Sequence, residues 1–230
     1  MSSLNKPGAM DAPVLIRRLL FFVLLFGLVF FYLVLSFQGL TSAKGIDQAQ
    51  IGREIARGND ATTKMIRPLA IWQAEENTGN GEINLDQIHD TYHSPLYPYL
   101  LGAVIKAVGG GDFDKFQMVE DERTIYRLDR VIAAVSVICF LVAIGINYLL
   151  ISRIFDVRIA GVTALLMALC DLNWKFTHTG LPQMLMLLLF SCALFFIYRA
   201  VEASIDNRAT IGSILLAAVF LALLALAHWL

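Results

Sequence analysis

Residues 14–37 read VLIRRLLFFVLLFGLVFFYLVLSF, and this stretch of 24 residues is the first sign of a membrane protein. At a rise of about 1.5 Å per residue, a helix of this length crosses a hydrocarbon core of about 30 Å. Further apolar stretches occupy residues 131–151, 159–174, 182–198 and 210–230. The sequence therefore predicts an all-α membrane protein with about five transmembrane helices.

Composition supports this class and excludes others. Hydrophobic residues make up 57% of the chain and the mean hydropathy is +0.65, well above the average for soluble domains. With a net charge of −1 there is no basic surface to neutralise phosphates, so no nucleic-acid partner is expected. The cysteines fall inside apolar stretches without metal-ligand or disulfide spacing, and we interpret them as small buried hydrophobes: Cys139, Cys170 and Cys192.

A cleaved signal peptide is the alternative interpretation of residues 14–37, because Thr41-Ser42-Ala43 resembles a cleavage site. The apolar region is longer than a signal peptide needs, which favours a membrane anchor. Residues 96–108 are also apolar, but their length suits a re-entrant or interfacial helix better than a crossing. Since the chain stops at the end of an apolar stretch, we expect that 230 residues are only the beginning of a longer protein.

A large hydrophilic loop, residues 38–126, follows the first span and holds eight Lys and Arg against thirteen Asp and Glu. Basic residues on short flanks mark the cytoplasmic side. If the chain crosses the membrane five times, the basic residues that flank the spans all lie on one side: Lys6, Arg17, Arg18, Arg153, Arg158, Arg199 and Arg208. The pattern predicts a cytoplasmic N-terminus and an external loop. Residues 175–181 and His228 fall on the same external side.

Within the loop, residues 47–58 predict a short helix with Asp47 as its N-cap, Gln50 as the capping-box partner and Gly58 at its end. Ile51 and Ile55 then share one face, suited to the membrane or to a neighbouring helix.

Residues 86–92 predict a second short helix, closed by Pro95. One face of this helix would carry Asp86, His89, Asp90 and His93, a spacing that can bind zinc. A solvated polar face explains the same pattern and is favoured, because Pro95 leaves the helix barely long enough to present both histidines.

Short motifs in a fixed order give a family resemblance. They are Asp47-Gln48 after the first span, His93-Ser94-Pro95-Leu96, Tyr126-Arg127-Leu128 before the second span, and the external turn 176–183. The chain resembles the N-terminal part of GT-C-fold glycosyltransferases that use a polyprenyl-phosphate sugar donor. In particular, it is similar to bacterial members of the dolichyl-phosphate-mannose protein mannosyltransferase family and to lipid A aminoarabinose transferases. The resemblance covers nearly the whole chain, as a single GT-C-like domain over residues 1–230.

This chain departs from the family pattern at three positions. Gln48 replaces a glutamate, Gln183 stands where an acid is common, and His228 stands near a common lysine. A glutamine carries no charge, which weakens any part of Gln183 in holding a cationic or metal-bridged donor. Asp171 or Lys175 are candidates to compensate.

The resemblance implies catalytic roles for two residues. Asp47 would be the base that deprotonates the acceptor hydroxyl, and His93 would bind the acceptor or orient Asp47. The structural alternatives are a helix N-cap for Asp47 and a turn residue for His93. Candidate substrate contacts, each of which has a solvated or structural alternative, are Gln48, Lys64, Arg67, Tyr97, Asp171, Lys175, His178, Gln183 and His228.

The resemblance thus implies an inverting transferase of the bacterial inner membrane, with a lipid-linked sugar as donor and no cofactor, although a divalent metal stays open. Its partners would be membrane lipid and the polyprenyl-phosphate sugar. We expect Lys175, His178 and His228 to converge with Asp47 and His93 on one cavity. The alternatives are a non-catalytic relative that binds lipid-linked sugar or a protein, and a transporter. Transport is disfavoured because no internal repeat is visible.

Overall fold

The computed structural model describes residues 12–65, 68, 71–72, 76, 88–109, 127–206 and 209–228. These residues are helical apart from their connections and an isolated antiparallel bridge between Thr62 and His89. The predicted all-α class is therefore confirmed. The chain divides into two compact units, Met1–Phe37 and Gln38–Leu230.

The first unit contains helix α1 (Ala12–Phe30), which continues into a π-helical turn, η1 (Phe31–Leu35). The turn ends where the Ser36 N–H donates to the Phe31 carbonyl at 2.8 Å. Large apolar side chains are exposed along α1, Phe26 to 73%. Such a surface suits contact with lipid, where a helix satisfies its own backbone polar groups.

The second unit holds two helices that are long and apolar enough to cross a membrane, α5 (Arg127–Ile154) and α8 (Gln183–Ile205). A third candidate is the bent pair α6 (Val157–Leu169) and α7 (Asp171–Thr177). Helix α9 (Ile211–Ala227) is apolar but shorter. The described residues therefore contain two or three helices that can span a membrane.

The predicted third span, residues 159–174, is broken at Cys170, where α6 and α7 meet at an angle of 56°. Trp174 packs beneath the break, with its ring 5.2 Å from Phe140 of α5 in an edge-to-face contact. Its indole N–H donates to the Ala168 carbonyl at 2.6 Å, so that a carbonyl freed by the break keeps a partner. The short α7 is thus held against α5 through Trp174, while much of its remaining surface is exposed.

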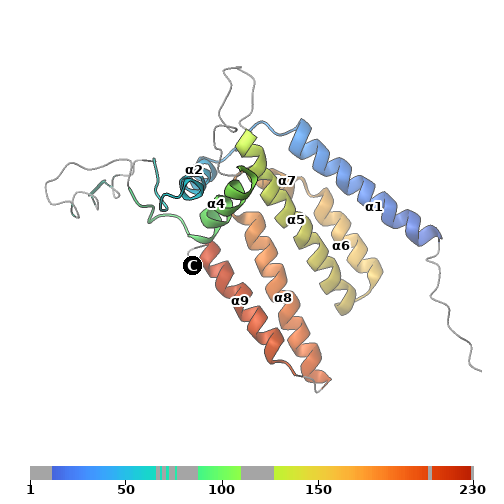
Figure 1. The fold of residues 1–230 in the computed structure, drawn as a ribbon. Coiled ribbons are helices and arrows are strands. Elements are labelled where there is room, and N and C mark those ends of the chain that lie inside the picture. Colours follow the sequence, from blue (N-terminus) through green and yellow to red (C-terminus); the bar gives the residue numbers. More distant parts are fainter. Residues whose placement is uncertain are drawn as a thin grey trace, which may run out of the picture. The chain divides into compact units, whose positions relative to one another are not determined.

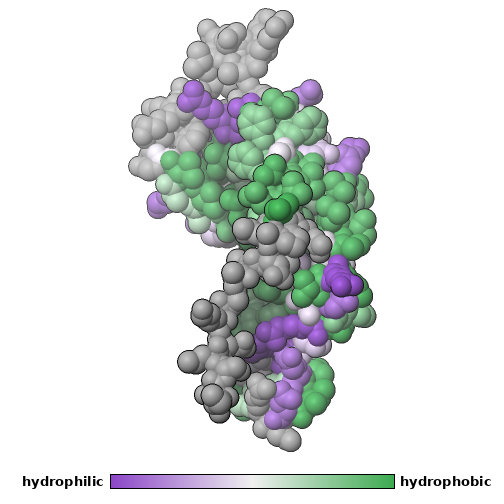
Figure 2. Space-filling view, turned by 90° about the vertical axis from the view of Figure 1, so that its right-hand side faces the viewer, coloured by the Kyte–Doolittle hydropathy of each residue, from purple (hydrophilic) through white to green (hydrophobic). Residues whose placement is uncertain are grey.

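Helix α5 packs against α6 and α8, and α8 packs against α9. The α5–α6 and α8–α9 connections lie at one end of these helices, whereas α2 (Ala43–Arg57) and α4 (Leu96–Gly109) lie at the other (Figure 1). Arg153 and Glu202 form a 3.1 Å ion pair between α5 and α8 near their shared end. Figure 2 shows hydrophobic residues over much of the described surface of one face, with hydrophilic residues in separate patches.

Close packing joins α2 to α4. A Cβ atom on Gly52 would lie 2.9 Å from Cβ of Leu101, and one on Gly102 would lie 2.7 Å from Cγ2 of Ile55. Both positions therefore need glycine for the two helices to approach. The predicted packing of Ile51 and Ile55 is confirmed for a neighbouring helix, since α2 lies against α4 and Ile51 is buried.

Two local predictions for the loop are wrong. Helix α2 begins earlier than expected, with Ser42 at the N-cap position, so Asp47 lies in the second turn and not at the N-cap. Gly58 ends the helix as predicted, at φ +89°. The described part of the predicted helix 86–92 is extended instead, because Ile88 and Asp90 share backbone hydrogen bonds with residues 61–63.

Candidate functional site

Asp47 is a buried carboxylate inside a helix, with 2% of its surface exposed. The Thr63 hydroxyl donates a 2.9 Å hydrogen bond to its Oδ1. A buried carboxylate is costly unless its oxygens are paired or hydrogen-bonded. Because Asp47 is not the N-cap, helix capping does not explain why this carboxylate is buried.

His93 faces the second oxygen of Asp47, with Nε2 3.6 Å from Oδ2. Its other ring nitrogen, Nδ1, lies 3.1 Å from Oδ2 of Asp90. The backbone N–H groups of His93 and Tyr92 also donate to Asp90, at 3.1 and 3.3 Å. Thr63, Asp47, His93 and Asp90 thus form a continuous polar row, which we call the Asp47–Asp90 row.

The pKa of Asp90 lies below its ordinary value. Burial alone would raise this pKa, but hydrogen bonds from the His93 ring, the attraction of that ring and the backbone donors of His93 and Tyr92 outweigh burial. Asp90 is therefore a carboxylate near neutral pH, which can accept hydrogen bonds but cannot donate them.

A short backbone pairing assembles this row from two distant segments. The Thr63 N–H donates to the Ile88 carbonyl at 2.9 Å, and the Asp90 N–H donates to the Ala61 carbonyl at 2.8 Å. These bonds hold the segment that carries Thr63 beside the segment that carries Asp90 and His93, and Thr63 reaches Asp47 from there.

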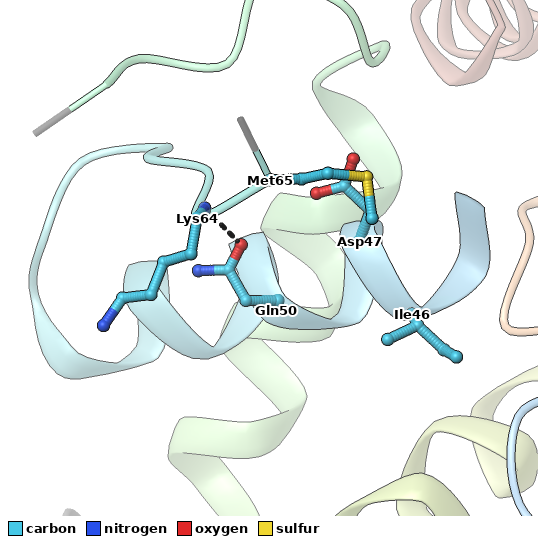
Figure 3. Close-up of a pocket in the computed structure, with 5 residues that line it drawn as sticks. All are labelled: Ile46, Asp47, Gln50, Lys64 and Met65. Atoms are coloured by element: carbon cyan, nitrogen blue, oxygen red, sulfur yellow. Dashed lines mark hydrogen bonds between the residues drawn. The ribbon is translucent and has the colours of Figure 1, made fainter. Parts of the chain in front are cut away.

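An open pocket of about 460 Å³ adjoins Asp47 and is lined by Ile46, Asp47, Gln50, Lys64 and Met65. The Lys64 N–H donates to Oε1 of Gln50 at 3.0 Å, which holds this segment to α2 (Figure 3). Figure 3 shows Asp47 beside Met65, with the Lys64 side chain extending away from both. The Lys64 side chain is 55% exposed and its Nζ lies 3.9 Å from Glu54. Asp47 and Lys64 both line this pocket, with the Asp47 carboxylate buried beneath its surface and the Lys64 side chain exposed.

Two contacts bring the ends of the apolar helices to the loop. The Thr41 N–H and hydroxyl donate to the His178 carbonyl at 3.0 and 3.4 Å, beside the turn between α7 and α8. The Ser94 hydroxyl donates to the Ala227 carbonyl at 2.6 Å, which places the end of α9, and therefore His228, next to the His93-Ser94 string.

The remaining predicted substrate residues occupy varied surroundings. Tyr97 is buried in α4 with its hydroxyl 3.4 Å from that of Ser136. Lys175 pairs with Asp171 at 2.6 Å on the exposed surface of α7. His178 is buried, whereas His228 is exposed. The residues that line the pocket do not include Lys175, His178 or His228.

The predicted substrate residues Gln48 and Gln183 each have a buried side-chain amide oxygen. Within the described residues, neither oxygen accepts a hydrogen bond. Arg67 and Asp86 lie outside the described residues. Among those that are described, no group of three or more His, Cys, Asp or Glu side chains is arranged to hold a metal ion.

Sequence reasoning missed the supporting members of the row. Thr63 carries no motif, because only the pairing with residues 88–90 brings it to Asp47. Asp90 was predicted only as part of a polar helix face, for which zinc binding was the less favoured interpretation. Its position three residues before His93 and five before Pro95 is also typical of an Asx-type turn, in which the carboxylate accepts from the following N–H groups.

Comparison with known proteins adds no identification: no family model, no curated protein and no solved structure matches this chain. The site must therefore be interpreted from its own geometry.

Proposed function

We propose that this chain is an integral membrane glycosyltransferase that moves a sugar from a polyprenyl-phosphate donor to an acceptor hydroxyl. The observation that carries the proposal is Asp47, a pocket-lining residue whose buried carboxylate accepts from Thr63 and faces His93. The likeness of the motif order to GT-C-fold enzymes supports it as well.

The chemistry follows from the roles that these residues suit. Asp47 takes the proton of an acceptor hydroxyl in the pocket, and the hydroxyl oxygen attacks the anomeric carbon. The bond from that carbon to the phosphate oxygen breaks, and polyprenyl phosphate leaves. Because this is one displacement, the anomeric configuration inverts. Among the residues that line the pocket, Lys64 carries a positive charge, and we assign it to bind the leaving phosphate.

The apolar helices give this chemistry a location. We propose that α1, α5, the bent pair α6–α7, α8 and α9 make five crossings, with the N-terminus in the bacterial cytoplasm. Arg153 and Arg158 then lie at the cytoplasmic end, and α2 and α4 lie at the external surface, where a lipid-borne phosphate is accessible.

Cysteine labelling tests this orientation. In a variant without native cysteines, Gly79→Cys should react with an impermeant maleimide in intact cells, although Gly79 itself lies outside the described residues. Arg158→Cys, the matched control in the first turn of α6, should react only after permeabilisation. The reverse pattern would place the pocket on the cytoplasmic side and remove the proposed site from the external surface.

A transfer assay tests the activity. Membranes that contain the protein would receive polyprenyl phosphates carrying radiolabelled sugars, and the label would be followed from the lipid to the aqueous or protein fraction. We expect transfer with inversion at the anomeric carbon. Retention of configuration would exclude the single displacement. Saturable donor binding without transfer would favour the non-catalytic alternative.

A further inference from the structure

The His93 ring lies between two carboxylates but makes a hydrogen bond to only one of them. Nδ1 is 3.1 Å from Oδ2 of Asp90, whereas Nε2 is 3.6 Å from Oδ2 of Asp47. The side chains of His93 and Asp90 are each 4% exposed and that of Asp47 is fully buried. Water therefore has little access to either ring nitrogen.

The contact with Asp90 decides where the ring carries its proton. An ionised carboxylate can only accept, so the short contact requires a hydrogen on Nδ1. Asp90 is ionised because its pKa is lowered by the hydrogen bonds described above, despite its burial. In the neutral ring, Nε2 is then a bare acceptor.

The unprotonated Nε2 of His93 is buried, and no described group donates a hydrogen bond to it. Nε2 makes no hydrogen bond within the described residues, and it faces an oxygen of Asp47, which is also an acceptor. A buried acceptor left without a donor is unfavourable, and so is the approach of two lone pairs. One proton placed between Nε2 and Oδ2 would relieve both.

We propose that Asp90 is a positioning residue that keeps the proton of His93 on Nδ1, so that Nε2 receives the proton that Asp47 takes from the substrate. The part that concerns the substrate rests on the proposed function. The assignment of the ring proton does not, because it depends only on contacts within the chain.

The proton balance is complete without a further reactant. The acceptor O–H bond breaks, its electron pair forms the new bond to the anomeric carbon, and its proton goes to Oδ2 of Asp47. The proton then moves to Nε2, which restores Asp47 as a carboxylate. The electron pair of the broken carbon–oxygen bond leaves with the phosphate. His93 becomes an imidazolium between Asp47 of α2 and Asp90 of its own segment, which among the described residues are the charged groups within ion-pair distance of the ring.

The alternative is that Asp90 only shapes the turn before Pro95. Its contacts with the N–H groups of Tyr92 and His93 would suffice for that, whichever ring nitrogen carried the proton. The two roles differ in the tautomer of one ring, which can be measured.

Nitrogen NMR of the full chain with ¹⁵N-labelled histidine, in detergent micelles, gives this measurement. The chain has four histidines, and His93→Gln identifies the signals of His93. At the alkaline end of a pH series, we expect His93 to be protonated on Nδ1. Asp90→Ala should shift it toward the Nε2–H form that free histidine favours. Asp90→Asn, which keeps a carbonyl acceptor, should restore the Nδ1–H form. Asp60→Ala, a change of an exposed aspartate in the same loop, should have no effect.

A wild-type His93 protonated on Nε2 would overturn the proposal, as would an Asp90→Ala spectrum identical to wild type. The transfer assay supplies the second readout. We expect Asp90→Ala to lower kcat roughly 10²-fold with little change in KM, and Asp90→Asn to recover most of it. If the wild type transfers sugar and Asp90→Ala is equally active, the proton relay is excluded but the glycosyltransferase function is not. An inactive wild type that shows the expected tautomer would contradict the glycosyltransferase and leave the ring assignment standing.

Discussion

The hydroxyl of Ser94 donates a 2.6 Å hydrogen bond to the backbone carbonyl of Ala227, 133 residues further along the chain. This contact joins the loop that carries His93 to the last turn of α9. Both groups are buried, so neither can turn to water when its partner is removed.

Replacing Ser94 should therefore destabilise the protein. Ser94→Ala leaves the Ala227 carbonyl without its donor, and we expect a loss of about 1–3 kcal/mol in the free energy of unfolding. Ser152→Ala is the matched control, because the Ser152 hydroxyl bonds to Leu149 of its own helix in an exposed position. Denaturant titration in detergent measures both variants. Equal effects of the two changes would mean that the contact between the loop and α9 adds nothing.

Gly45 should not tolerate a side chain. A Cβ atom at this position would lie only 1.9 Å from the Thr179 carbonyl oxygen and 2.9 Å from the Gly180 carbonyl carbon. Gly45→Ala must then push α2 away from the α7–α8 turn, and we expect a cost of about 1–3 kcal/mol or more. Gly145→Ala in α5 meets nothing within 4 Å and should be neutral or slightly stabilising. The comparison uses the same unfolding measurement, and a stable Gly45→Ala protein would argue against this close approach.

Thr63 should matter through its hydroxyl. Thr63→Val keeps the shape of the side chain but removes the donor to Asp47, and hydrogen bonds to charged groups contribute about 1.5–3 kcal/mol. Thr63→Ser retains the hydroxyl and should keep most of the stability. Thr163→Val in α6 removes an exposed hydroxyl that bonds within its own helix, and it should change little. If Thr63→Ser were as unstable as Thr63→Val, the methyl group rather than the hydrogen bond would be responsible.

Acid stability should reveal Asp90. The folded protein lowers the pKa of Asp90 from 3.8, so its carboxylate stabilises the fold above this pH. That contribution is lost as the pH falls through the lower folded value. The difference in melting temperature between wild type and Asp90→Asn should therefore shrink between about pH 5 and about pH 3. Asp60→Asn, at an exposed position of the same loop, is the control variant. A difference that stays constant down to pH 3 would contradict the lowered pKa.

The sequence was sufficient for the helical class and for the two longest apolar helices, α5 and α8, because long apolar runs leave little choice of structure in a membrane. It was also sufficient for the end of α2, since Gly58 supplies the left-handed conformation that ends a helix. The start of α2 was misplaced because Asp47 is a good N-cap by type. Ser42 is equally good by type, and the longer helix brings Gly45 close to residues 179–180, a packing that local sequence does not show.

The site was predictable only in part. Asp47 and His93 were named together from the order of short motifs, and the structure places them 3.6 Å apart. Thr63 and Asp90 depend on a backbone pairing between segments that show no strand pattern, so local sequence gave no signal for it. Lys175 was predicted to contact substrate, and the structure shows it paired with Asp171, four residues before it on α7.

The most direct test of the central claim is the transfer rate of Asp47→Asn with a lipid-linked sugar donor. Asparagine has the size of aspartate and can still accept from Thr63, but it cannot take a proton from the acceptor. We expect the rate to fall roughly 10²–10⁴-fold while the protein stays folded. Asp60→Asn, at an exposed position of the same loop, should retain the wild-type rate. Wild-type turnover by Asp47→Asn would remove Asp47 from the mechanism and contradict the proposed function of this site.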